Sequence, residues 1–349
     1  MRAVVLRDHL LALEEVPTPV PRPGQVLVRT LACGICGSDL HFVHHGERMT
    51  ALAREGGSTS TLDLSRGVVM GHEFVGEVLE TDASSMTAAK EGDRVVTVPV
   101  NFVGTPEPEN MRSVGYSNDF PGGYGEYMAL FGPLLHVVPN GLSTEVAALT
   151  EPMAVGLHAV NKSGIARSGS AIVHGCGPVG LAVIASLRLL GVETIVASDF
   201  SPRRRALAEA MGAAVTVDAK VASPHETWTS ATGGSLEAQA AMVQFECVGV
   251  RGMLDELMRR APRHGRITVV GVCMETDQIT PIIAINKELQ LNFVLAYTPD
   301  EFRDSLHHLA EGRIDAAPLI TGRVPLDGVP RAFVDLANPE EHAKIIVLP

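Results

Sequence analysis

Two cysteines, a serine, an aspartate and three histidines fall within one short stretch, LACGICGSDLHFVHHG, residues 31–46. A thiolate and an imidazole are ligand types that zinc prefers, and a hydroxyl near an imidazole can move a proton. A lone cysteine is more often a small buried apolar residue. The stretch therefore predicts a metal site only if partners occur elsewhere in the chain.

Candidate partners occur in two later segments. His72 and Glu73 are adjacent in VVMGHEFVGEV, and Glu151 stands in LTEPMAVGLHAV. With Cys36 they supply a thiolate, an imidazole and carboxylates, the donor types of a catalytic zinc that keeps one position open for water or substrate. Their spacing along the chain does not itself bring them together, so the fold must do so.

A second motif combines a strand, a glycine-rich turn and a helix, in AIVHGCGPVGLAVIASLRLLG. This is G-x-G-x-x-G, in which the first glycine permits a tight turn, the second lets the backbone approach a pyrophosphate, and the third lets helix and strand pack closely. The helix N-terminus then directs N–H groups at the phosphates. The predicted cofactor-binding residues of this turn are Gly175, Gly177, Pro178, Val179 and Gly180.

The next predicted strand ends at Asp199, about 20 residues after the turn, where a ribose-binding acid is expected. Such an acid hydrogen-bonds the ribose hydroxyls and repels a 2′-phosphate, so the sequence predicts NAD rather than NADP. Three arginines follow at 203–205. Among them Arg204 is a candidate to contact adenine or a 2′-phosphate, and the alternative is a solvated helix start.

Strand and helix patterns divide the chain into two parts. Residues 1 to about 150 contain short β-type runs separated by Gly and Pro, such as QVLVRTLAC and EFVGEVLE, which predict a mostly antiparallel β domain. Residues 153–292 alternate strand and helix, which predicts parallel strands with crossover helices. The polar segment 47–67, with Gly-Gly and a Ser/Thr cluster, is predicted to be a long surface loop, or alternatively a lid or oligomer contact.

Composition excludes several classes of protein. The net charge of −12 over 349 residues argues against nucleic acid or an anionic membrane as a partner. Five scattered cysteines form no disulfide framework and suit a reducing compartment. The charged N-terminal segment predicts no signal peptide, and no apolar run is long enough for a membrane span. We therefore expect a cytoplasmic protein.

Seven motifs in this order resemble those of the zinc-dependent medium-chain dehydrogenase/reductase (alcohol dehydrogenase) superfamily over essentially the whole chain: GICGSDLH, GHEFVGEV, EGDRV, GGYGEY, EPMAVGLHAV, GCGPVGL and ECVG. Glu-Pro at 151–152 is similar to the sorbitol and threonine dehydrogenase branch. The resemblance implies an α/β chain with a GroES-like mostly-β catalytic domain, 1–152 completed by 293–349. It also implies a Rossmann doubly wound parallel-sheet NAD-binding domain at 153–292.

The resemblance assigns roles to individual residues. Cys36 and His72 match zinc ligands, and either Glu73 or Glu151 completes the set. Further matches lie near Cys36: Ser38 and His41 match a hydroxyl–imidazole proton relay, and Asp39 matches an acid that supports the site. Cys33, in contrast, is interpreted as a core residue.

The resemblance implies a zinc-dependent enzyme that transfers a hydride between NAD and a secondary alcohol or polyol. The alternatives are an amino-alcohol dehydrogenase of the threonine type and a zinc-free enone or quinone reductase on the same fold. Many relatives carry a four-cysteine structural zinc lobe, but residues 95–125 contain no cysteine. We therefore expect one catalytic zinc per subunit and no structural zinc, and a homodimer or homotetramer by analogy.

Overall fold

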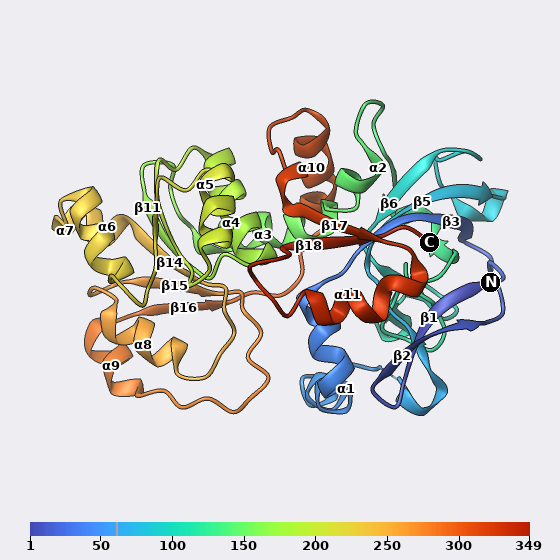
Figure 1. Cartoon of the computed structure of the whole chain (residues 1–349), viewed down its shortest axis with the longest axis horizontal. Coiled ribbons are helices and arrows are strands. Elements are labelled where there is room, and N and C mark those ends of the chain that lie inside the picture. Colours follow the sequence, from blue (N-terminus) through green and yellow to red (C-terminus); the bar gives the residue numbers. More distant parts are fainter. Residues whose placement is uncertain (61) are drawn as a thin grey trace. The chain divides into compact units, whose positions relative to one another are not determined.

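The computed structural model describes residues 1–60 and 62–349, which form two compact units (Figure 1). The first unit is Met1–Glu151 with Ile320–Pro349, and the second is Pro152–Leu319. Helix α10, Pro299–Ala310, therefore belongs to the second unit, whereas the sequence analysis gave all of 293–349 to the first.

The first unit is built around the long strand β3, Gln25–Gly34, which pairs antiparallel with β5, Glu73–Glu80, and with β18, Lys344–Val347. Val26 and Val28 on β3 are fully buried. The sheet order is β10-β6-β5-β3-β18-β17, with β9 also paired to β3. The remaining strands of this sheet are β6 (Arg94–Thr97), β9 (Tyr127–Phe131), β10 (Leu135–Val137) and β17 (Ile320–Val324).

The pairing register positions the residues that carry chemistry. Gly34 at the end of β3 lies opposite Glu73 at the start of β5 and opposite Ile346 on β18. The chain leaving β3 at Cys36 and the chain entering β5 at His72 therefore meet at the same end of the sheet. Smaller elements complete the unit: β1 (Arg2–Arg7), β2 (Leu10–Glu15), β4 (Val68–Val69), β7 (Val100–Phe102), β8 (Met111–Ser113), α2 (Thr144–Ala147) and α11 (Val329–Asp335).

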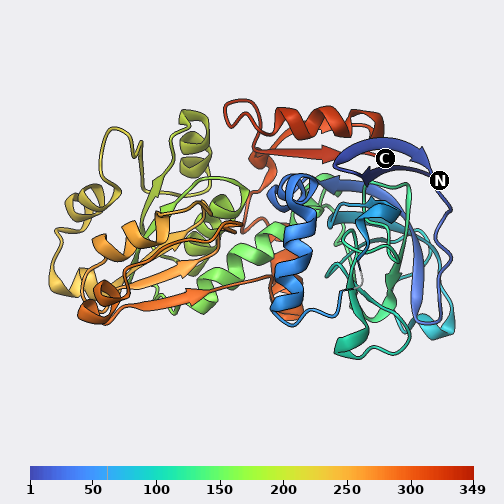
Figure 2. The ribbon, with the colours of Figure 1, turned by 90° about the horizontal axis from the view of Figure 1, so that it is seen from below.

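Helix α1, Gly37–Glu55, directly follows β3 and appears as the long blue helix of Figure 2. Its backbone departs from helical geometry at His45 (φ −133°, ψ 23°), so the helix is kinked there. The prediction of a surface loop over 47–67 was wrong for its first half, because α1 continues to Glu55 and ends before Gly56-Gly57. A short 3-10 turn follows at Leu64–Arg66, and Thr61 lies outside the described residues.

The second unit holds a six-stranded parallel sheet in the order β13-β12-β11-β14-β15-β16. Counted within the unit this is 3-2-1-4-5-6, the doubly wound order, which confirms the predicted fold class. Figure 1 shows α4 and α5 on one side of the sheet and α8 and α9 on the other. The strands are β11 (Ser170–His174), β12 (Thr194–Ser198), β13 (Val215–Val217), β14 (Met242–Glu246), β15 (Arg266–Val269) and β16 (Gln290–Phe293). The helices are α3 (Thr150–Ser163, crossing the boundary), α4 (Pro178–Leu190), α5 (Pro202–Ala210), α6 (Pro224–Thr232), α7 (Leu236–Ala241), α8 (Met253–Arg260) and α9 (Pro281–Lys287).

Candidate active site

The structure brings three potential metal ligands together. One donor atom from each of Cys36, His72 and Glu73 lies within 4.8 Å of the others. A thiol, an imidazole and a carboxylate that converge in this way fit the donor set of zinc.

Glu73 has a partner that the sequence analysis missed. The Lys344 ammonium contacts Oε1 and Oε2 of Glu73 at 2.7 Å each and donates to the carbonyl of Ile35 at 3.0 Å. Both ionic side chains are 0% exposed. Burial lowers the pKa of Lys344, but Glu73, Cys36 and Glu151 together raise it more, so the net shift is upward. The available signal was a lysine at the head of the apolar run KIIVLP.

Glu151 lies in the first turn of α3 and stands outside the group of three donors. Its negative charge nevertheless contributes to the raised pKa of Lys344, so it is within electrostatic reach of the Lys344–Glu73 pair. The geometry thus brings together donor atoms of Cys36, His72 and Glu73, and Glu151 acts on this group only through its charge.

The Asp39 carboxylate is fully buried and accepts three hydrogen bonds. The hydroxyl of Tyr116 donates to Oδ1 at 2.6 Å, the hydroxyl of Tyr124 to Oδ2 at 2.7 Å, and the backbone N–H of Cys36 to Oδ2 at 3.1 Å. His72 Nδ1 lies 3.4 Å from Oδ1. Asp39 is therefore placed to orient both Cys36 and His72.

The same contacts set the charge of this cluster. Burial pushes the pKa of Asp39 up, but His72 and the two tyrosine hydroxyls lower it, so Asp39 is a carboxylate. Burial depresses the pKa of His72, yet the Asp39 charge raises it well above its usual value. A carboxylate next to an imidazole in this way strengthens it as a metal ligand.

Ser38 and His41, the predicted relay, both lie on the first two turns of α1. The Ser38 Oγ is 3.0 Å from the hydroxyl oxygen of Tyr116. Within the described chain, no hydrogen bond joins Ser38 to His41, which is exposed. Partial burial and the neighbouring His45 and His44 lower the pKa of His41, so its imidazole is neutral at pH 7.

Tyr116 connects several parts of this cluster and was missed by the sequence analysis. Its ring centroid lies 5.2 Å from that of His72 and 4.8 Å from that of Phe42. Burial and the Asp39 charge raise the pKa of Tyr116 well above its usual value, so the hydroxyl keeps its proton. The signal was a pair of tyrosines, Tyr116 and Tyr124, in the cysteine-free segment 95–125.

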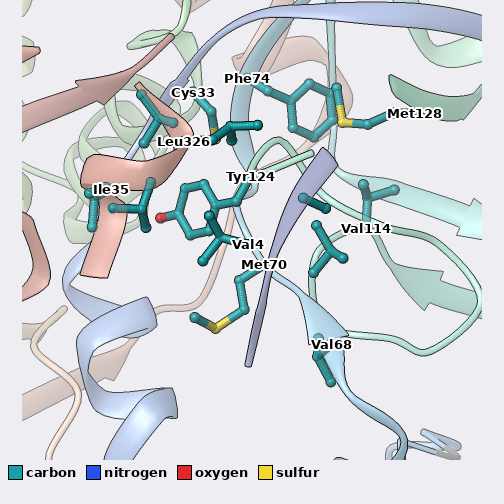
Figure 3. Close-up of a cluster of buried hydrophobic side chains, with 14 of the residues drawn as sticks. Val4, Cys33, Ile35, Val68, Met70, Phe74, Val114, Tyr124, Met128 and Leu326 are labelled. Atoms are coloured by element: carbon teal, nitrogen blue, oxygen red, sulfur yellow. The ribbon is translucent and has the colours of Figure 1, made fainter. Parts of the chain in front are cut away.

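Cys33 is a core residue, as the sequence analysis proposed. It is fully buried, and burial raises the pKa of its thiol well above the usual value. Figure 3 shows Cys33 among apolar side chains, with Phe74 and Tyr124 in the same cluster. A neutral thiol in such surroundings is a packing group and not a reactive one.

The glycine-rich turn of the second unit has the geometry that its motif predicts. Gly175 follows β11 with φ at +90°, a conformation that favours glycine. A Cβ at Gly180 would lie 1.9 Å from the carbonyl oxygen of Gly175. A Cβ at Gly177 would meet nothing within 4 Å, so the backbone is open there at the start of α4, whose first residues are Pro178 and Val179.

Asp199 follows β12 and binds the glycine-rich turn directly. Its Oδ2 accepts the N–H of Cys176 and its Oδ1 accepts the N–H of Ser201, each at 2.8 Å. Both bonds hold the Asp199 carboxylate beside the glycine-rich turn. The Nε of Arg204 is buried without a hydrogen-bond partner in the described part of the chain.

Comparisons with known proteins agree over the whole chain. Residues 22–140 match the family described as Alcohol dehydrogenase GroES-like domain, and residues 178–311 match Zinc-binding dehydrogenase. The chain is 32% identical to (R,R)-butanediol dehydrogenase of Bacillus subtilis, over 97% of this chain and 96% of the relative. It is 29% identical to sorbitol dehydrogenase of Gallus gallus, over 95% and 92%.

Solved structures give the same result. The crystal structure of 2R,3R-butanediol dehydrogenase from Bacillus subtilis has a TM-score of 0.84 at 31% identity, covering 100% of this chain and 99% of that one. A zinc-binding dehydrogenase from Sinorhizobium meliloti 1021 bound to NADP has a TM-score of 0.83 at 29% identity, with the same coverage. Within the described residues, no helix is both long and apolar enough to cross a membrane.

Proposed function

Because the chain belongs to the zinc-dependent medium-chain dehydrogenases of the alcohol dehydrogenase family, we propose that Cys36, His72 and Glu73 or Glu151 hold one zinc and that the second unit binds NAD. The enzyme is an oxidoreductase acting on secondary alcohols or polyols. The convergence of Cys36, His72 and Glu73 within 4.8 Å carries the proposal. Bound zinc would polarise the substrate oxygen and lower the pKa of its hydroxyl.

The protein groups around these ligands have separate tasks. Asp39 orients Cys36 and His72 through the contacts described above. Lys344 pairs with the buried Glu73 side chain and balances its negative charge. Ser38 is the group that accepts a hydrogen bond from the substrate hydroxyl, and His41, whose imidazole is neutral at pH 7, is the proposed acceptor of the released proton nearer to solvent.

The substrate is proposed to be a diol or longer polyol. Two relatives that match nearly the full chain are named for butanediol and sorbitol. These two compounds are therefore the first substrates to test. Oxidation of L-threonine in preference to both would instead support the amino-alcohol alternative.

The cofactor is proposed to be NAD. Asp199 places a carboxylate beside the glycine-rich turn, and an anionic group there repels a 2′-phosphate. The NADP-bound Sinorhizobium relative shows that this fold also accepts the phosphorylated cofactor, so the preference must come from local charge.

We further propose one zinc per chain and a homodimer. Residues 95–125 offer no cysteine for a second, structural site. Strand β16 is the edge of the parallel sheet, and Phe293 and Leu295 at its end are 70% and 85% exposed. An open edge with exposed apolar residues is suited to pairing with the same edge of a second copy.

The decisive experiment is elemental analysis of protein purified without chelator. The wild type and Cys33→Ala are expected to carry about one zinc per chain, and Cys36→Ala is expected to lose it. A second zinc that survives in Cys36→Ala would contradict the single site. Metal-free wild type with intact hydride transfer would instead support the zinc-free reductase.

A further inference from the structure

We propose that Tyr116 is a positioning residue that fixes the direction of the Ser38 hydroxyl, so that Ser38 accepts a hydrogen bond from the substrate hydroxyl. This inference rests on the proposed function, because it concerns how the same site receives an alcohol. The Ser38–Tyr116–Asp39 chain of hydrogen bonds is its basis.

The hydrogen-bond chemistry of the three groups leaves one direction. The Asp39 carboxylate only accepts, so the single O–H of Tyr116 must donate to Oδ1, at 2.6 Å. The Tyr116 oxygen then has only lone pairs to offer Ser38. At 3.0 Å from that oxygen, the Ser38 O–H is therefore the donor.

This direction decides what Ser38 offers to a substrate. A serine hydroxyl has one hydrogen and two lone pairs, and it normally rotates to suit its neighbours. With its hydrogen committed to Tyr116, Ser38 presents lone pairs. An alcohol hydroxyl entering beside Cys36 and His72 therefore finds an acceptor already oriented and need not reorient a competing donor.

Tyr124 provides an internal comparison. Its hydroxyl donates to the other oxygen of the same carboxylate, at 2.7 Å, but it has no bond to Ser38 among the described contacts. Tyr124 is fully buried in the core, whereas Tyr116 is partly exposed and packs on the His72 ring. Both tyrosines support Asp39, and only Tyr116 also holds Ser38.

The test compares Tyr116→Phe with Tyr124→Phe, because each loses one hydrogen bond to Asp39. With 2,3-butanediol and NAD, Tyr116→Phe is expected to lower kcat about tenfold, the cost of one hydrogen bond to a charged network. KM and zinc content should change less than about twofold, and the solvent isotope effect on kcat should change. Tyr124→Phe is expected to lower kcat several-fold less than Tyr116→Phe does, and its solvent isotope effect should equal that of the wild type.

Ser38→Ala examines the same bond from its other end. It should lower kcat at least as much as Tyr116→Phe. Adding Tyr116→Phe to it should cost no more than Tyr124→Phe costs alone, because only the hydrogen bond to Asp39 is then left to lose. Full activity of Ser38→Ala overturns the inference even if Tyr116→Phe fails to fold.

The outcomes separate the two proposals. An active, zinc-containing wild type with equal losses in Tyr116→Phe and Tyr124→Phe overturns the role of Tyr116 alone. The role of Tyr116 is also overturned if the double variant Ser38→Ala/Tyr116→Phe lowers kcat by the product of the two single losses. A wild type that oxidises neither butanediol nor sorbitol overturns the proposed function, and this inference with it.

Discussion

The Nζ of Lys344 lies 2.7 Å from both carboxylate oxygens of Glu73, and neither side chain is exposed to solvent. The two residues are far apart in sequence and meet because β18 and β5 both pair with β3. A buried ion pair of this kind depends on both partners, since either charge alone is costly in a low-dielectric interior.

Removing the Lys344 ammonium should therefore destabilise the fold strongly. Lys344→Met is expected to lower the free energy of unfolding by about 3–5 kcal/mol, because it strands the Glu73 carboxylate. Urea unfolding in EDTA measures this without a contribution from metal. The double variant Glu73→Gln/Lys344→Met should recover most of the loss. A double variant no more stable than Lys344→Met would show that the lysine acts through packing and not through charge.

Two glycines of the nucleotide turn should respond differently to the same change. Gly180→Ala places a Cβ 1.9 Å from the carbonyl of Gly175, so it should lower the thermal unfolding temperature and abolish NADH binding. Gly177→Ala meets nothing within 4 Å and should fold normally while binding NADH at least tenfold more weakly. Fluorescence titration and thermal unfolding of both variants test the contrast. Wild-type affinity in Gly177→Ala would mean that the cofactor does not approach this backbone.

Cofactor choice should depend on Asp199. Asp199→Asn keeps an oxygen for the N–H of Cys176 but removes the charge. We expect the ratio of kcat/KM for NAD to that for NADP to fall at least tenfold, because the repulsion of a 2′-phosphate is lost. Steady-state kinetics with both cofactors measures the ratio, and Asp300→Asn, which alters an exposed carboxylate on α10, is the control. An unchanged ratio would assign the preference to another residue.

Acid should destabilise the second unit through His174. Burial and the nearby His225 lower the pKa of His174 to about 3. The unfolded chain takes up a proton near pH 6.5, and the folded chain does not until about pH 3, so stability is lost as the pH falls through this window. Between pH 7 and 5 the wild type should lose about 2 kcal/mol more than His174→Gln. Urea unfolding at both pH values measures the difference.

The control for this experiment is His307→Gln, which alters an exposed histidine and should keep the wild-type pH dependence. If His174→Gln and the wild type lost stability in parallel, the acid sensitivity would belong to other groups.

Assembly should depend on the edge of the parallel sheet. Phe293→Asp is expected to convert the homodimer into monomers, because it places a charge on the proposed apolar contact. Light scattering coupled to size-exclusion chromatography measures the mass. Leu10→Asp alters a side chain that is 72% exposed in the first unit and should leave the dimer intact. A monomeric wild type would contradict the proposed dimer.

Local patterns predicted most of the fold. Strand–helix alternation over 153–292 and the glycine-rich turn identified the doubly wound sheet, because both signals lie within short windows of sequence. The segment 47–55 was wrongly predicted to be a loop, because the Gly-Gly and Ser/Thr residues after it are typical of loops. Its own residues, ERMTALARE, are mostly good helix formers and form the second half of α1.

The site was only partly accessible from sequence. Cys36, His72 and Glu73 stand in sequence motifs that predict metal ligands. Tyr116 and Lys344 carry no motif, and their importance arises from β-sheet register and from a loop that returns over α1. Contacts of this kind join residues that are distant along the chain, so neither composition nor periodicity reports them.

The kink at His45 divides α1 into two halves that are held by different contacts. The first half carries Ser38 and Asp39 and is pinned by two tyrosines, so its register cannot shift without disturbing the chemistry. The second half is free of that constraint. A change in the length or composition of the second half can therefore leave the hydrogen bonds of Ser38 and Asp39 in place.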